Sequence, residues 1–142
     1  MSGFLLGTNV ISELIKPQPE TNVTAWIEDT DESLLYLSVL TLGEIRRGVA
    51  ALPQSRRRAI LEAWLETDLR ARFAERILTI DQEVADRWGL LTAAARSSGI
   101  VLPVIDSLLA ATALEHNLTL VTRDVGQIPT TRVAVFNPWK SD

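Results

Sequence analysis

Residues 4–14 of the chain read FLLGTNVISEL. The apolar run at 4–6 is typical of a short buried strand, and the segment after it has the composition of a helix. Gly7 stands at the carboxyl end of this strand. We expect the helix to begin near Thr8 and Asn9, with Asn9 capping the free amides of the first turn. A strand, a turn and a helix in direct succession form the unit from which parallel sheets are built.

The rest of the chain repeats this alternation of short β-rich runs and helix-length segments. No Gly/Ser-rich linker, low-complexity tract or internal repeat divides it. We therefore predict a single domain over residues 1–142, of the α/β class, with a central parallel sheet of about four to five strands flanked by helices. The strands are expected at residues 4–6, 35–38, 76–80, 119–121 and 132–136.

The composition indicates a soluble globule. Of the 142 residues, 46% are hydrophobic and 23% are charged, so the apolar segments are interrupted often enough by charge to stay in water. No apolar run approaches the roughly 20 residues that span a bilayer, and the first residues lack the basic region of a secretory signal. We expect a cytoplasmic protein that does not enter the membrane.

The cysteine and histidine counts restrict the chemistry. With no Cys, the chain can form neither disulfides, thiolate nucleophiles nor Cys-ligated zinc sites. A single His argues against a His-rich metal site and against a Ser-His-Asp triad. Any metal must therefore rest mainly on oxygen ligands.

The net charge argues against passive binding to nucleic acid. At -4, with a sequence pI near 5.0, the chain lacks the basic surface that such binding needs, although divalent ions could reverse the local field. The main basic clusters are Arg46-Arg47 and residues 56–58, and the second is either a solvated helix face or a contact for phosphate.

Three acidic residues, Glu44, Asp106 and Asp124, each lie beside a hydrophobic segment. Each has a purely structural explanation. Glu44 follows Thr41 at the spacing of a capping box, Asp106 suits the first turn of a helix, and Asp124 suits a turn. Alternatively, a parallel sheet gathers them with position 7 around one metal site. Asp106 favours that alternative, because a buried anion needs a partner and no Lys or Arg lies at helical spacing from it.

Four stretches together resemble the PIN-domain nucleases, and within them the VapC and FitB-like toxins of bacterial toxin–antitoxin pairs. They are LLGTNVISEL at 5–14, LYLSVLTLGEIRRGV at 35–49, PVIDSLLAATALEHNLTLVTRD at 103–124 and VFNPW at 135–139. Their order and spacing cover nearly the whole chain, so the resemblance implies a PIN-like fold throughout.

The resemblance also implies a set of catalytic and metal-binding positions. Glu44, Asp106 and Asp124 match family acids, although related toxins often carry Asn where Asp124 stands. Position 7 matches the family's first catalytic Asp but holds Gly. Taken without the family, Gly7 would be explained by a tight turn or a close approach of backbone to phosphate. With the family, it replaces a metal-binding Asp.

The implied activity is that of a metal-dependent endoribonuclease, impaired in this chain by Gly7. Oxygen ligands would hold Mg2+ or Mn2+, which would activate a water for attack on an RNA phosphodiester bond. Thr8, Asn9 and Thr122 would orient ligands or water, and Arg123 would contact phosphate. Each of these four also suits a cap or a turn.

The implied partners are a cognate antitoxin, an RNA substrate, and DNA only indirectly through the antitoxin, in a homodimer or a toxin–antitoxin hetero-oligomer. An alternative is a mainly non-catalytic binding module that acts with its antitoxin in a DNA-binding autoregulatory complex. A third hypothesis, a receiver-like signalling domain, requires an acidic pair near the first strand and a Lys at a late strand end. The chain has Gly7-Thr8 and Arg123-Asp124 there.

Overall fold

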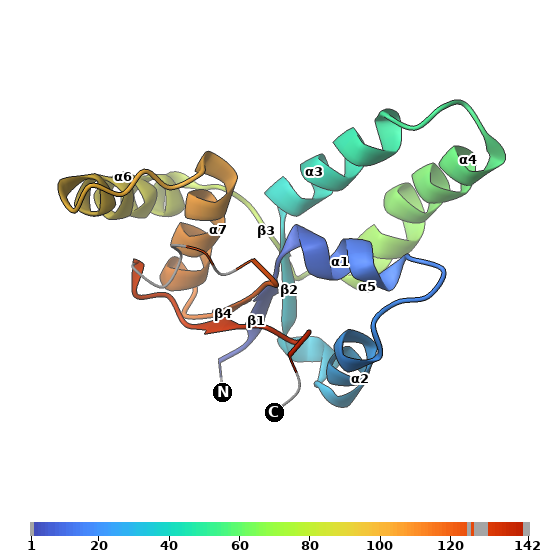
Figure 1. Cartoon of the computed structure of the whole chain (residues 1–142), viewed down its shortest axis with the longest axis horizontal. Coiled ribbons are helices and arrows are strands. Elements are labelled where there is room, and N and C mark those ends of the chain that lie inside the picture. The colour runs from blue at the N-terminus through green and yellow to red at the C-terminus, as the bar shows by residue number, and fades with distance from the viewer. Residues whose placement is uncertain (1, 125, 127–130, 141–142) are drawn as a thin grey trace.

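Five parallel strands form one central sheet in the order β3-β2-β1-β4-β5. The computed structural model describes residues 2–124, 126 and 131–140 (Figure 1). The strands are β1 (Phe4–Leu6), β2 (Leu35–Ser38), β3 (Ile77–Leu78), β4 (Thr119–Val121) and β5 (Val135–Phe136). The sheet confirms the predicted α/β class and its parallel strands.

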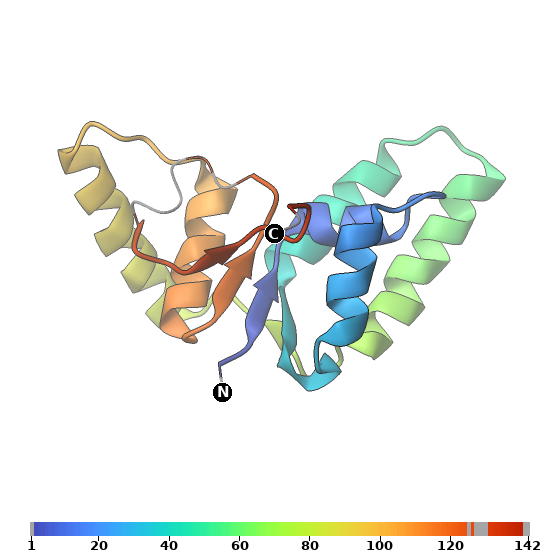
Figure 2. The same cartoon turned by 60° about the horizontal axis from the view of Figure 1, so that its bottom comes forward.

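Helical segments connect the strands. They are α1 (Thr8–Leu14), α2 (Thr21–Asp29), the short 3-10 helix η1 (Glu32–Leu34), α3 (Val39–Ala50), α4 (Arg56–Ala63), the π-helical η2 (Trp64–Leu69), α5 (Arg70–Arg72), α6 (Gln82–Ser97) and α7 (Val104–Glu115). Figure 2 shows α6 and α7 on one side of the strands and α2, α3 and α4 on the other. None of the helices in the described part of the chain is long and apolar enough to cross a membrane.

The sheet is covered on both faces. Leu5 and Leu6 are both fully buried, yet they belong to different clusters of core side chains. Successive residues of a strand point to opposite faces, so β1 contributes one leucine to each side. Leu6 packs with residues of α1, α2, α3 and η2, whereas Leu5 packs with residues of α7 and β4. The two cores make β1 the centre of the fold.

The sequence prediction was accurate for three strands and wrong in several local details. β1, β2 and β4 have the predicted bounds, whereas β3 and β5 are shorter than the runs at 76–80 and 132–136. Asn9 does not cap α1: its N-cap is Gly7, which makes no side-chain cap bond. Thr41 does not cap α3, because the helix begins earlier. Its N-cap is Ser38, whose hydroxyl accepts a hydrogen bond from the backbone N–H of Leu40.

The sheet brings the carboxyl ends of its strands to one edge. Leu6 pairs with Val121 at the end of β1 and β4, and the N–H of Gly7 donates to the Val121 carbonyl at 2.8 Å. Between these two strands the chain order reverses, which is where open parallel sheets form a ligand crevice. Gly7 and Thr122 therefore stand side by side at the mouth of that crevice.

Candidate active site

A pocket of about 400 Å³ opens at this edge, beside the ends of β1 and β4. It collects side chains from α1, α3, α7, the segment after β4 and the C-terminal segment. Its lining includes all eight site residues that the sequence analysis selected: Gly7, Thr8, Asn9, Glu44, Asp106, Thr122, Arg123 and Asp124. The structure places these eight residues around one pocket, and their catalytic and metal-binding roles stay predictions.

The backbone conformation at position 7 does not require a glycine. Its φ of -70° and ψ of 162° lie in the extended region, which any residue adopts. A Cβ at this position would lie 3.0 Å from the Val121 carbonyl oxygen and 3.5 Å from the Thr122 Cβ. The first contact is tight, so the Val121 carbonyl would have to move by a few tenths of an ångström to admit a side chain at position 7. Neither turn geometry nor dihedral strain therefore explains the glycine.

Glu44 reaches the pocket from the second turn of α3. The Thr8 hydroxyl, at the start of α1, donates a short hydrogen bond to Glu44 Oε1 and lies 3.3 Å from the Thr41 hydroxyl. The guanidinium of the exposed Arg47 lies 4.0 Å from Glu44 Oε2. Glu44 is thus held by another helix, which the capping-box explanation did not anticipate.

Asp106 lies in the first turn of α7 and has a raised pKa. Burial is the largest cause, and the negative charges of Asp124 and Glu44 add to it. Neither Asp106 nor Asp124 forms an ion pair with any cation in the described part of the chain. The charges of Glu44 and Asp124 therefore act on Asp106 through space, and Arg47 beside Glu44 is the one cation paired with these three carboxylates in the described residues.

Thr122 links the two sides of the crevice. Its hydroxyl accepts a hydrogen bond from Asn9 Nδ2 at 3.1 Å and another from the backbone N–H of Asp124, also at 3.1 Å. The first bond joins α1 to the end of β4, and the second shapes the backbone that presents Asp124. Asn9 Oδ1 is buried and has no hydrogen-bond partner among the described residues.

Glu13, Lys16 and Trp139 also line the pocket, and the sequence analysis did not select them. Glu13 is 5% exposed, and its carboxylate accepts from Lys16 Nζ at 2.9 Å, from the Glu20 N–H at 2.9 Å and from Trp139 Nε1 at 3.4 Å. These contacts lower its pKa, with the Lys16 bond the largest cause and the Glu20 bond next. The three-residue spacing of Glu13 and Lys16 was a signal in the sequence, although Lys16 lies just beyond the end of α1. No local signal in the sequence indicated the contact between Glu13 and Trp139.

The donor chemistry of the pocket suits a hard divalent cation. Carboxylate oxygens are the ligands that Mg2+ and Mn2+ prefer, and a cation would relieve the repulsion that, after burial, raises the pKa of Asp106. Among the residues that the structure describes, however, no group of three or more acidic or histidine side chains is arranged closely enough to hold a metal ion. The ligand type fits, and the ligand set is incomplete.

The PIN domain model matches residues 4–130. The chain belongs to the PIN-domain family. Toxin FitB of Neisseria gonorrhoeae is 42% identical over 136 residues, which cover 96% of this chain and 98% of FitB. VapC ribonuclease Y4jK of Sinorhizobium fredii is 38% identical over 137 residues, which cover 96% of this chain and 98% of that protein.

The fold agrees with that family. A solved structure of FitAB bound to the IR36 DNA fragment superposes on this PIN domain with a TM-score of 0.93 and 39% identity, covering 98% of this chain and 97% of the FitAB chain. The resemblance drawn from the sequence motifs is confirmed at the level of family and fold.

Proposed function

We propose that this PIN domain is the toxin of a toxin–antitoxin pair and that its pocket is a metal-dependent site for hydrolysing RNA phosphodiester bonds, impaired by Gly7. One observation carries the proposal: Glu44, Asp106 and Asp124 line one pocket, and the pKa of Asp106 is raised by burial and by the other two charges. A cluster of like charges in which Asp106 and Asp124 have no ion-pair partner among the described residues costs stability, which is the pattern expected of a functional site.

Glu44, Asp106 and Asp124 would hold a divalent cation such as Mg2+ or Mn2+. When bound, such an ion lowers the pKa of a water and neutralises charge that develops on a phosphate. Thr8 holds the Glu44 carboxylate through its hydroxyl, and Thr122 holds the backbone at Asp124. Both contacts restrict the orientation of an oxygen donor before any ligand arrives.

Gly7 leaves this set one carboxylate short of the family pattern. Its position adjoins Thr122 and Asn9, and its extended backbone would direct a side chain into the same pocket. We propose that an Asp at this position would complete the ligand set. Losing a ligand that stabilises the transition state costs at least about 100-fold in rate.

The proposed partner is a cognate antitoxin, through which the chain would contact operator DNA. Support comes from the relatives: one is named a toxin, another a VapC ribonuclease, and the FitAB structure contains a DNA fragment. Among the residues that the structure describes, four large apolar side chains are more than half exposed, namely Ile60, Leu90, Val101 and Val104. Exposed apolar surface of this kind suits burial in an antitoxin complex or a homodimer.

The alternative, a mainly non-catalytic binding module, is favoured by one specific observation. The incomplete ligand set at Gly7 would reduce catalysis without altering surfaces far from the pocket. Under this alternative, the chain would bind its antitoxin and repress transcription with it, and it would not cleave RNA even with the carboxylate restored.

The test is cleavage of a structured RNA in Mg2+ and in Mn2+ by three versions of the full chain. They are the parent, Gly7→Asp, and Gly7→Asp combined with Asp106→Asn. We expect Gly7→Asp to cleave at least about 100-fold faster than the parent, and the double variant to lose that gain. Equal rates in the parent and Gly7→Asp would show that three carboxylates suffice. No cleavage by any version would favour the binding module.

A further inference from the structure

The pocket has a basic side as well as an acidic one. Lys16 and Arg123 both line it, opposite in charge to the three carboxylates. Lys16 is already paired with Glu13, at 2.9 Å between Nζ and Oε1. Arg123 is exposed and makes no ion pair with a carboxylate in the part of the chain that the structure describes. Its charge is therefore available to a ligand.

The Arg123 guanidinium lies over an aromatic ring. The carbon at the centre of its guanidinium lies 5.4 Å from the centroid of the Trp139 ring, within the range of a cation–π contact. This contact restricts the long side chain without using its N–H groups as hydrogen-bond donors. A guanidinium held in this way keeps its planar set of donors for a phosphate.

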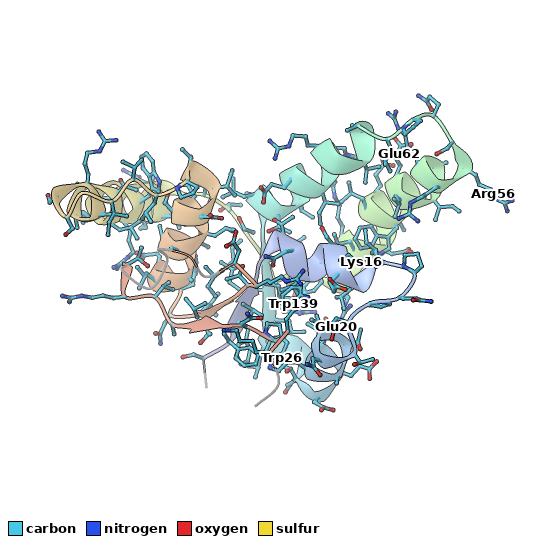
Figure 3. The ribbon with its side chains drawn as sticks, in the orientation of Figure 1. Lys16, Glu20, Trp26, Arg56, Glu62 and Trp139 are labelled. Atoms are coloured by element: carbon cyan, nitrogen blue, oxygen red, sulfur yellow. The ribbon has the colours of Figure 1, made fainter. Side chains whose placement is uncertain are left out.

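Trp139 is itself fixed by contacts from three separate segments. Its indole N–H donates to Glu13 Oε1 in α1 at 3.4 Å, its carbonyl accepts from Asn22 Nδ2 in α2 at 3.0 Å, and its backbone N–H donates to Asn137 Oδ1 at 2.9 Å. In Figure 3, Trp139 lies close to α1, whereas Arg56 projects from α4 far from it. The ring is thus a fixed support at the edge of the pocket.

An acidic pocket needs a cationic side chain held in place if its substrate is a polyanion. The net charge of -4 and the three carboxylates repel an RNA strand until a cation attracts it. Lys16 is the weaker candidate, because a strand that used it would have to compete with the Glu13 carboxylate. No carboxylate of the described residues competes in this way for Arg123.

We propose that Arg123 contacts a phosphate of the RNA strand beside the acidic cluster, and that Trp139 is a positioning residue that holds Arg123 there. The inference rests on the proposed function, since it names how the RNA is held at the proposed site. It goes further in assigning a role to Trp139 and, through the indole hydrogen bond, to Glu13.

The experiment measures equilibrium binding of a fluorescein-labelled single-stranded RNA of about 12 nucleotides, a length within the footprint of single-strand grooves. Fluorescence anisotropy is followed over a salt series, in EDTA and in Mg2+, and a gel verifies that the RNA stays intact. The proteins are the full chain, Arg123→Gln, Trp139→Leu, Trp139→Phe, the double variant Arg123→Gln with Trp139→Leu, and Arg56→Gln as a control with the same charge change outside the pocket.

We expect Arg123→Gln to weaken binding about three- to tenfold and to flatten the salt dependence by about 0.7 in slope, the value for one lost phosphate contact on a single strand. Trp139→Leu should cause a similar loss in the parent and almost none in the Arg123→Gln background, because it acts through Arg123. Trp139→Phe should keep most of the affinity, and Arg56→Gln should leave the slope unchanged.

Three results would overturn the proposal: no RNA binding by the parent, unchanged binding by Arg123→Gln, or an equal loss from Trp139→Leu in both backgrounds. The last would mean that the ring contacts RNA itself. If Trp139→Leu fails to fold, Arg123→Gln and Trp139→Phe still decide the outcome. Failure of the proposed function is separate: it would appear as absent cleavage by Gly7→Asp while binding still depended on Arg123.

Discussion

The Thr8 hydroxyl donates a hydrogen bond to the Glu44 carboxylate across the pocket, and this bond joins the first residue of α1 to the second turn of α3. The two residues are 36 positions apart in the chain, and neither is fully exposed. The hydrogen bond therefore holds Glu44 in one orientation at the edge of the sheet, where an extended glutamate side chain would otherwise sample several rotamers.

Replacing this donor should weaken the fold measurably. Thr8→Val keeps the shape of the side chain but removes the hydroxyl, so the free energy of unfolding should fall by about 1.5–2 kcal/mol, the lower part of the range for a hydrogen bond to a charged group. Urea denaturation measures the change. Thr8→Ser is the matched control, because it keeps the hydroxyl and loses only a methyl group. Equal losses in the two variants would attribute the effect to packing instead.

The raised pKa of Asp106 predicts a penalty that depends on pH. The Asp106 carboxyl binds its proton more tightly in the folded chain than in the unfolded chain. Stability is therefore lost as the pH rises from the ordinary pKa of 3.8 through the raised pKa of the folded chain, and the loss stays constant at higher pH. In EDTA at neutral pH, Asp106→Asn should raise the Tm by a few degrees, although it forgoes a favourable charge in the first turn of α7.

That gain should disappear at a pH near 3, where Asp106 is protonated in both states. Scanning calorimetry across this range measures the difference. Asp86→Asn, at an exposed position of α6, is the control and should show no comparable gain at neutral pH. A lower Tm for Asp106→Asn at neutral pH would contradict the electrostatic explanation of the cluster.

Glu13 should show the opposite dependence on pH. Its folded pKa is lowered by the bonds from Lys16 and the Glu20 N–H, so its stabilising effect is complete above the ordinary value of 4.5 and is lost as the pH falls through the lower folded value. Glu13→Gln should lower the Tm by several degrees at neutral pH, and its difference from the parent should shrink in acid. Glu28→Gln, at an exposed site on α2, is the control. A difference that persists unchanged below the folded pKa would refute the assignment.

Substitutions at Gly7 should separate steric from electrostatic costs. Gly7→Ala places a Cβ 3.0 Å from the Val121 carbonyl, and its allowed dihedral angles add no strain, so its stability should stay within about 1 kcal/mol of the parent. Gly7→Asp should be less stable than Gly7→Ala in EDTA, because it adds a fourth carboxylate to the cluster. Urea denaturation in EDTA compares the two. A stability of Gly7→Asp equal to that of Gly7→Ala would mean that the new carboxylate lies away from the other three.

Much of the fold could be predicted because its signals are local. The runs at β1, β2 and β4 are short and mostly apolar, and their predicted limits agree with the structure. The meeting of Glu44, Asp106 and Asp124 also followed from the sequence, since parallel strands bring their carboxyl ends to one edge. The resemblance to the PIN-domain nucleases then selected position 7 and its neighbours Thr8 and Asn9.

The missed features depend on contacts between distant segments. Asn9 was expected to cap α1, but it bonds to Thr122, 113 positions away. Thr41 was expected to cap α3, but the helix begins earlier, at a hydroxyl that also satisfied the sequence rules for capping. The contact between Glu13 and Trp139 spans 126 positions. Such pairs are set by tertiary packing, and a single sequence carries no local signal for them.

The most direct test of the account is the affinity for Mn2+ measured by titration calorimetry on the parent, Gly7→Ala and Gly7→Asp. If Gly7 stands in the place of a metal-binding carboxylate, Gly7→Asp should bind Mn2+ at least about tenfold more tightly than the parent, a gain of about 1.4 kcal/mol. Gly7→Ala should match the parent, because it adds the Cβ without the carboxylate. Equal affinity in all three proteins would contradict the claim that the missing carboxylate limits this site.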